Sequence, residues 1–144
     1  MTELQDIRDG LYYTLYTWGP FTASEMSTCA FDVLEFASGC AIVFLPGDSD
    51  FEALGFGASG NDYRHWGIEG SGYIKDTGDP KSLLRRVWKF HDDLYDTVRL
   101  DHTLNGAASF ARVTRMSFAR DVGVEAGGHY WAEVKFTVIA DVLD

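Results

Sequence analysis

The chain has 144 residues and a formal net charge of -10, and hydrophobic residues make up 46% of it. This apolar content excludes a disordered chain, and the length is that of one domain with its own core. The acidic balance argues against a nucleic-acid reader, which needs a basic face, and no apolar run approaches the roughly 20 residues that cross a bilayer. We therefore expect a single soluble domain.

The first predicted element is a helix over about residues 3 to 17. Trp18-Gly19-Pro20 ends it, because proline cannot continue the helical hydrogen-bond ladder. A glycine inside the helix, Gly10, costs about 1 kcal/mol relative to alanine, so we expect close packing there. Four apolar residues at spacings of three and four form one stripe: Leu4, Ile7, Leu11 and Leu15.

The middle of the chain predicts two strands around a long loop. Residues 30–36, AFDVLEF, fit either a short strand or a helical turn, whereas 40–45, CAIVFL, predict a strand that ends at Pro46-Gly47. Residues 46–64 are rich in glycine and aspartate, and we expect a loop there. A strand over 65–74 follows, and its glycines indicate a bend or a close neighbouring backbone.

The second half predicts a helix and a hairpin. Asp79 caps a helix that starts at Pro80 and ends near Arg99. Two long strands over 107–120 and 129–142 follow, joined by a glycine-rich link that lets them pair as a hairpin. The element order is therefore α-β-β-α-β-β. It predicts an α+β fold with a mostly antiparallel sheet and both helices packed on one face.

Candidates for chemistry are weak. Residues 55–60 match G-x-G-x-x-G, but no strand precedes them and no helix follows, so we interpret them as loop. Asp48, Asp50 and Glu52 lie in no calcium-binding pattern. The two cysteines, Cys29 and Cys40, lack zinc-ligand spacing, and we interpret them as small buried residues rather than a disulfide. The four histidines are scattered along the chain: His65, His91, His102 and His129. We expect no catalytic site, cofactor or metal; a site assembled only in space is the alternative.

Several segments together resemble the tail terminator (tail completion) proteins of long-tailed bacteriophages. The likeness rests on IRDGLYYTL, CAIVFLPGDSDF, a strand with Trp66 before a DP-led helix, and the closing HYWAEVKFTVIADV. The most specific stretch is LDHTLNGAA (100–108), which resembles a D-x-T-L-x-G segment that follows the second helix in such proteins.

The resemblance implies a structural virion protein. Such proteins form a hexameric ring that caps the tail tube, ends its polymerisation and joins the tail to the head connector. The implied partners are further copies of the chain, the tail tube protein and connector proteins, while DNA passes through the lumen without specific binding and no membrane is involved. The implied location is the tail or neck of the virion, after assembly in the host cytoplasm. The alternatives are another phage neck or head-completion protein and a stand-alone acidic interaction domain.

A ring requires one patch on each subunit that fits a different patch on the next. Open strand edges suit such a contact, and we expect them on 107–120 and 129–142. We also expect the 46–64 loop to order only on assembly, so that replacing Phe51 and Phe56 by serine leaves folding intact. The candidate interface residues are Phe51, Leu54, Phe56, Tyr63, Trp131, Glu133, Lys135 and Ile139.

Overall fold

The structure is a computed structural model that describes residues 3–21, 26–27, 40–53, 62–76, 80–118, 123–124 and 130–143. The predictions for 30–36, the motif at 55–60, Cys29, His129 and the Asp79 cap lie outside these residues. The helices are α1 (Glu3–Trp18) and α2 (Pro80–Leu100). The strands are β1 (Met26–Ser27), β2 (Cys40–Pro46), β3 (Asp50–Ala53), β4 (Asp62–Asp76), β5 (Phe110–Phe118), β6 (Gly123–Val124) and β7 (Tyr130–Leu143).

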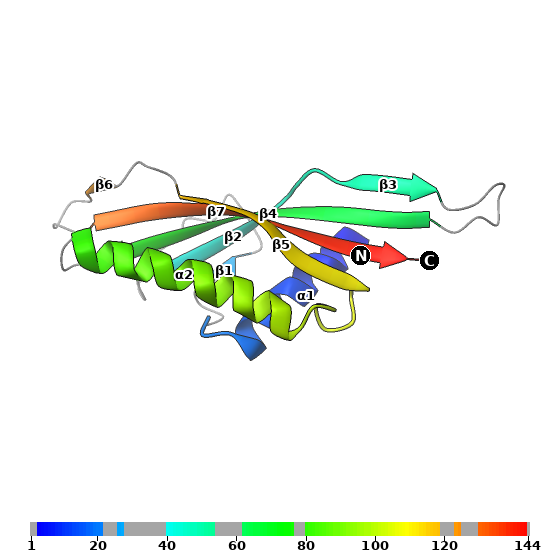
Figure 1. The fold of residues 1–144 in the computed structure, drawn as a ribbon, viewed down its shortest axis with the longest axis horizontal. Coiled ribbons are helices and arrows are strands. Elements are labelled where there is room, and N and C mark those ends of the chain that lie inside the picture. The colour runs from blue at the N-terminus through cyan, green and yellow to red at the C-terminus, as the bar shows by residue number, and fades with distance from the viewer. Residues whose placement is uncertain are drawn as a thin grey trace.

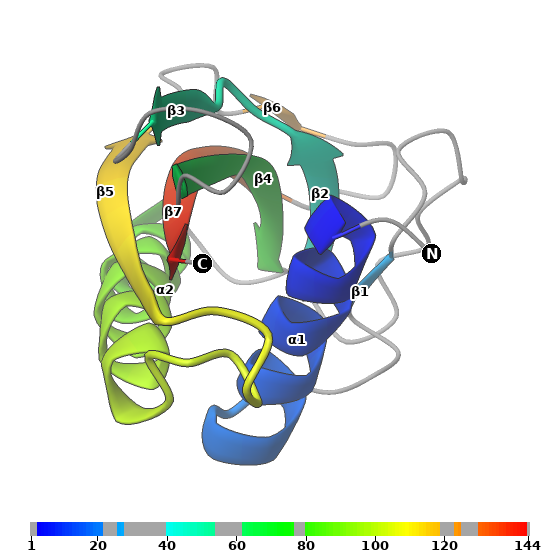
Figure 2. The same ribbon diagram turned by 90° about the vertical axis from the view of Figure 1, so that its right-hand side faces the viewer.

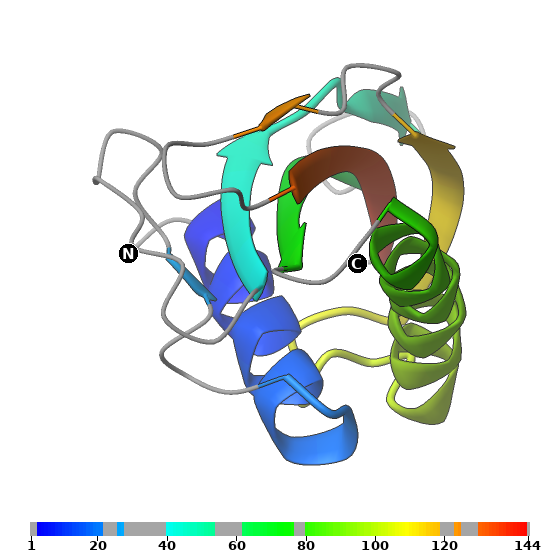
Figure 3. The ribbon, with the colours of Figure 1, turned by 90° about the vertical axis from the view of Figure 1, so that its left-hand side faces the viewer.

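The strands form one sheet in the order β1-β2-β4-β7-β5, with β3 also paired to β4 and β6 to β7 (Figure 1). All of these pairings are antiparallel except that of β1 with β2. Figures 2 and 3 show α1 and α2 side by side on the concave side of the curved sheet. The α+β fold with a mostly antiparallel sheet is therefore confirmed.

The core lies between the helices and the concave face, which we call the inner face. Alternate residues of β4 and β7 point inward because side chains alternate across a strand. They pack against the apolar stripes of both helices. The buried inner set comprises Ile68, Ile74, Ala132, Val134, Phe136, Val138 and Ala140 from the sheet, Ile7, Leu11 and Leu15 from α1, and Leu83, Val87, Phe90 and Leu94 from α2.

Two glycines of β4 make room for aromatic rings in this core. A Cβ atom on Gly70 would overlap the ring of Phe136, and one on Gly72 would overlap the ring of Phe90. These two rings lie next to each other, with centroids 6.3 Å apart. At Gly70 and Gly72 the close neighbour is therefore a buried side chain, whereas Gly67 lies against the Asp48 backbone, the close neighbouring backbone that the glycines indicated.

The strand predicted over 107–120 begins later, at Phe110, and carries a bulge. Pairing with β7 shifts register between Val113 and Arg115. The extra residue lets Ala111 and Val113 face inward before the bulge and Met116 after it, although strict alternation would separate the last two.

Two expectations about the sheet were wrong. The stretch 46–64 is not a continuous loop, because Asp50–Ala53 forms β3 and pairs with residues 62–65 of β4. That pairing satisfies main-chain groups and places the Phe51 ring edge-on to Trp66, with centroids 5.0 Å apart. The strand over 129–142 has no open edge along most of its length, because β4 pairs along one side and β5 along the other.

The segment that carries the resemblance fixes α1 to the rest of the fold. The Asp101 carboxylate accepts hydrogen bonds from Thr14 Oγ1 (2.9 Å), Thr103 Oγ1 (3.0 Å) and the Asn105 backbone N–H (2.9 Å). This turn drives Leu104 into the core with a positive φ of 49°. Gly10 of α1 lies directly against the Leu104 carbonyl, so a Cβ atom there would overlap that oxygen.

Replacing Gly10 by alanine should destabilise the protein by about 1–3 kcal/mol, because the added methyl forces α1 away from the Leu104 turn. Helix propensity alone predicts the opposite sign, a gain of about 1 kcal/mol. Urea unfolding measures the difference. The control Thr17→Ala, at an exposed position of the same helix, should change stability by less than about 0.5 kcal/mol. A more stable Gly10→Ala protein would contradict the close packing.

Candidate functional site

The face of the sheet opposite the helices is the candidate site, and we call it the outer face. Neither described helix covers it (Figure 2). The register of the strands places a mixed set of polar and apolar side chains there. They are Tyr63, His65, Glu69, Ser71 and Tyr73 from β4, Glu133, Lys135, Thr137, Ile139 and Asp141 from β7, and Arg112, Arg115 and Ser117 from β5.

Most of the described candidate interface residues share this face. Glu133, Lys135 and Ile139 occupy alternate positions of β7, and Tyr63 of β4 pairs with Leu143 at the end of the same strand. Trp131 occupies a further position of that series, paired with Lys75.

The structure separates Phe51 from that set. Phe51 lies on the inner side of β3, with 57% of its surface exposed, and packs on Trp66. Leu54 and Phe56 lie outside the described residues. The role of all these residues as an interface stays a prediction.

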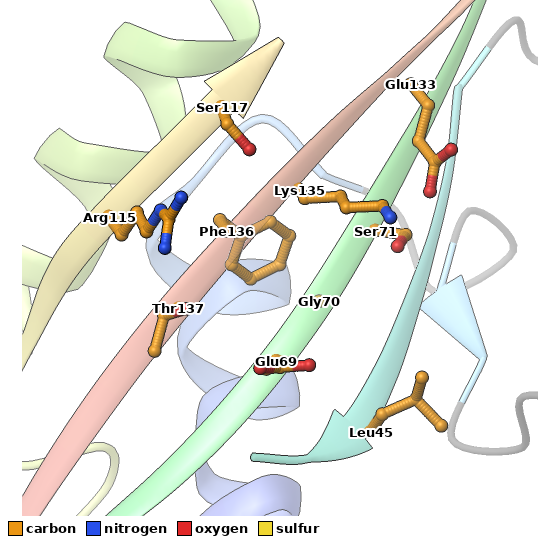
Figure 4. Close-up of a pocket in the computed structure, with 10 residues that line it drawn as sticks. All are labelled: Leu45, Glu69, Gly70, Ser71, Arg115, Ser117, Glu133, Lys135, Phe136 and Thr137. Carbon is orange, nitrogen blue, oxygen red and sulfur yellow. The ribbon is translucent and has the colours of Figure 1, made fainter. Parts of the chain in front are cut away.

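A hollow of about 440 Å³ opens on the outer face, over β2, β4, β7 and β5 (Figure 4). Charged side chains of both signs line it, together with three hydroxyl groups and the exposed Leu45. The polar lining consists of Glu69, Glu133, Arg115, Lys135, Ser71, Ser117 and Thr137. Such alternating charge fits a protein surface of complementary pattern better than a single small anion or cation.

At one end of this face, Tyr73 lies next to Glu133 across the β4–β7 pair. Burial of its hydroxyl group, and to a smaller extent the Glu133 carboxylate, raise the pKa of Tyr73 above its ordinary value of 10.0. Tyr73 therefore stays neutral and can donate a hydrogen bond at any physiological pH.

At the other end, a buried carboxylate organises a charged cluster. The Asp141 side chain is 7% exposed and accepts hydrogen bonds from His65 Nδ1 and Arg112 Nη1, each at 2.5 Å. The Tyr63 ring stacks on the His65 imidazole with centroids 4.5 Å apart. The other imidazole nitrogen, Nε2, lies 3.7 Å from the Glu52 carboxylate. Charges of alternating sign thus cross four strands in the order Glu52, His65, Asp141 and Arg112.

The Asp141 hydrogen bond is the largest influence on His65, and it raises the pKa of the imidazole above its ordinary value of 6.5. Partial burial of the ring acts in the opposite direction, while the charges of Asp141 and Glu52 add to the increase. Protonated His65 is the form that completes the alternating row, because it separates two carboxylates.

An Asp–His pair is also the orienting half of a nucleophilic catalytic site. Catalysis of that kind needs a hydroxyl or thiol at the second imidazole nitrogen, but here Nε2 faces the Glu52 carboxylate. Within the described ranges, no group of three or more histidine, cysteine or acidic residues could hold a metal ion. The geometry is that of an ion-pair row.

Little in the sequence pointed to this cluster. His65 was counted among four scattered histidines, and Asp141 lies 76 residues away. The two become neighbours only through the β4–β7 register, in which they are directly paired. Once two strands are known to pair, opposite charges at their paired positions are the sequence signal that identifies an ion-pair row of this kind.

No protein-family model matches the chain, and no curated protein matches it. No helix in the described part of the chain is long and apolar enough to span a membrane. The functional interpretation therefore depends on the geometry of the outer face together with the resemblance drawn from the sequence.

The His65 pKa gives a testable dependence of stability on pH. Because the folded-state pKa lies above the unfolded value of 6.5, the stabilisation is fully present below pH 6.5 and is lost as the pH rises through the folded-state pKa. Thermal unfolding of the wild-type protein and of His65→Gln, compared from pH 5.5 to pH 9, should show the wild-type advantage shrinking with rising pH. A constant difference between the two proteins would contradict this assignment.

Proposed function

We propose that this chain is a structural assembly subunit, a tail terminator of a long-tailed bacteriophage that closes into a ring on the end of the tail tube. The observation that carries the proposal is the outer face: one complete side of the sheet is left uncovered by the described helices and presents mixed charges beside apolar groups. In the virion, the ring ends tube polymerisation and connects the tail to the head.

The outer face has the composition of a protein-binding surface. Its centre holds half-buried Ile139 and Thr137, and exposed Lys135 and half-buried Glu133 lie on the same strand. Protein interfaces combine a central apolar area with charged groups that select and orient the partner. The hollow is open and lined by both signs of charge, which favours a second protein surface over a small substrate.

The relation to terminator proteins rests on the sequence resemblance, and its most specific segment is LDHTLNGAA. In the fold, Asp101 and Leu104 of this segment contact α1. Another phage neck protein or a stand-alone acidic interaction domain could use the same outer face. The state of the protein on tail tubes separates these functions, because only a terminator caps a tube with a ring.

The first test mixes the purified protein with tubes assembled from the tail tube protein encoded in the same genome. We expect sixfold rings at one end of each tube and no further tube growth, seen by negative-stain electron microscopy. Lys135→Glu, on the outer face, should weaken tube capping at least about tenfold, or about 1.4 kcal/mol. The matched control Lys81→Glu, exposed on α2, should cap tubes normally. Tubes that stay uncapped, or a stable compact dimer in place of the ring, would contradict the proposal.

The second test concerns DNA. With 22 acidic and 12 basic side chains, a ring lumen or rim formed by this chain should let the genome pass without adhesion. We expect no measurable affinity for duplex DNA in fluorescence anisotropy, even at low ionic strength. Tight binding that weakens steeply with added salt would indicate a nucleic-acid reader instead.

A further inference from the structure

Among the described strands paired on one side only, β3 and β5 are the two that are longer than two residues. β3 pairs only with β4, and β5 pairs only with β7. The start of β5 is covered by the preceding turn, because the Ala111 N–H donates to the His102 carbonyl at 2.6 Å. The open part of β5 therefore runs from Val113 to Phe118. Open edges expose main-chain donors and acceptors that can pair with another strand.

The two edges carry opposite charge. β3 has the sequence DFEA, with Asp50 and Glu52 and no basic residue. β5 has the sequence FARVTRMSF, with Arg112 and Arg115 and no acidic residue. The register places all four charged side chains on the outer face. Phe51, between the two acids, points to the inner side.

We propose that β3 of one copy adds to the open edge of β5 of the next copy, as the contact that joins subunits head to tail. This inference deepens the proposed function and rests on it, because such a contact is the repeating interface of the ring. In each copy β3 runs in the direction of β7, and β5 runs in the opposite direction. Two copies in the same orientation therefore bring β3 and β5 together antiparallel, as in the rest of the sheet.

The contact continues the alternating charge row from one subunit into the next. Within a copy the row ends at Arg112, whose side chain is 42% exposed and binds Asp141 through one terminal nitrogen. A guanidinium group carries five N–H donors and can bind a second carboxylate. The acids of the incoming β3 meet Arg112 and Arg115, so the order of negative and positive groups is preserved across the junction.

Apolar surface supports the same contact on the inner side. Four large apolar side chains of α2 are exposed: Leu84 by 42%, Trp88 by 74%, Tyr95 by 46% and, at the end of the helix, Leu100 by 63%. Helical spacing places the first three on the flank opposite Phe90 and Thr97, which lie against the residues just after α1, Phe21 and Gly19. Figure 2 shows β5 beside that flank of α2. The exposed Phe51 of an incoming strand thus meets apolar side chains, which favours a second copy as the occupant.

A charge-exchange experiment tests the contact with the full chain alone. Asp50→Arg and Arg115→Glu each place like charges in the junction, so each variant by itself should self-associate at least about tenfold more weakly than wild type. In an equimolar mixture, each variant supplies the edge that the other requires, so association should return. Sedimentation velocity at high protein concentration and low salt measures both effects.

Arg85→Glu and Asp92→Arg, which reverse exposed charges on α2, are the matched controls and should associate as wild type does. Unchanged association of the single variants, a mixture that fails to recover, or a wild type that stays monomeric at the highest attainable concentration would overturn the proposal. Different results would contradict the proposed function and this interface. Sixfold rings on tubes that survive the charge reversals would retain the function and refute this interface. Open filaments that depend on the same charges but never cap a tube would support this interface and refute the proposed function.

Discussion

The antiparallel pairing of β4 with β7, unbroken from Tyr63–Leu143 to Asp76–Tyr130, is the constraint on which the other features depend. Because side chains alternate across a strand, this one register assigns every residue of both strands to the inner or the outer face. A slip by one residue would expose Val134, Phe136 and Val138 and bury Glu133 and Lys135. The core and the candidate site are therefore two consequences of the same pairing.

Buried side chains and both helices pack tightly on the inner face. Gly70 admits the ring of Phe136, Gly72 admits the Phe90 ring of α2 close to the sheet, and Gly10 admits the Leu104 turn close to α1. At its first residue α1 is also tied to the sheet, because Glu3 binds the Arg64 guanidinium and accepts a hydrogen bond from the Trp66 indole at 2.6 Å. Both described helices therefore lie on the inner side, and neither of them covers the outer face.

The buried Asp141 carboxylate connects the stability of the fold with the charged groups of the outer face. Asp141 is 5% exposed as a residue, and an isolated carboxylate at such a depth would be strongly destabilising. His65 and Arg112 compensate for its burial, and each comes from a different neighbouring strand. The cluster therefore fixes β4, β7 and β5 in register and at the same time presents Arg112 at the edge where a further copy would dock.

By itself the sequence determined the elements with strong local signals. The stripe Leu4, Ile7, Leu11 and Leu15, the proline start of α2 and the alternation of β7 each follow from local periodicity or backbone chemistry, and the α+β class follows from their order. Only the tertiary structure decided the rest. β3 is a short strand hidden in a stretch rich in glycine and aspartate, the bulge after Val113 depends on pairing with β7, and β7 proved to be central in the sheet. The row from Glu52 to Arg112 joins residues of four strands, because contacts between distant segments depend on register and no local pattern encodes it.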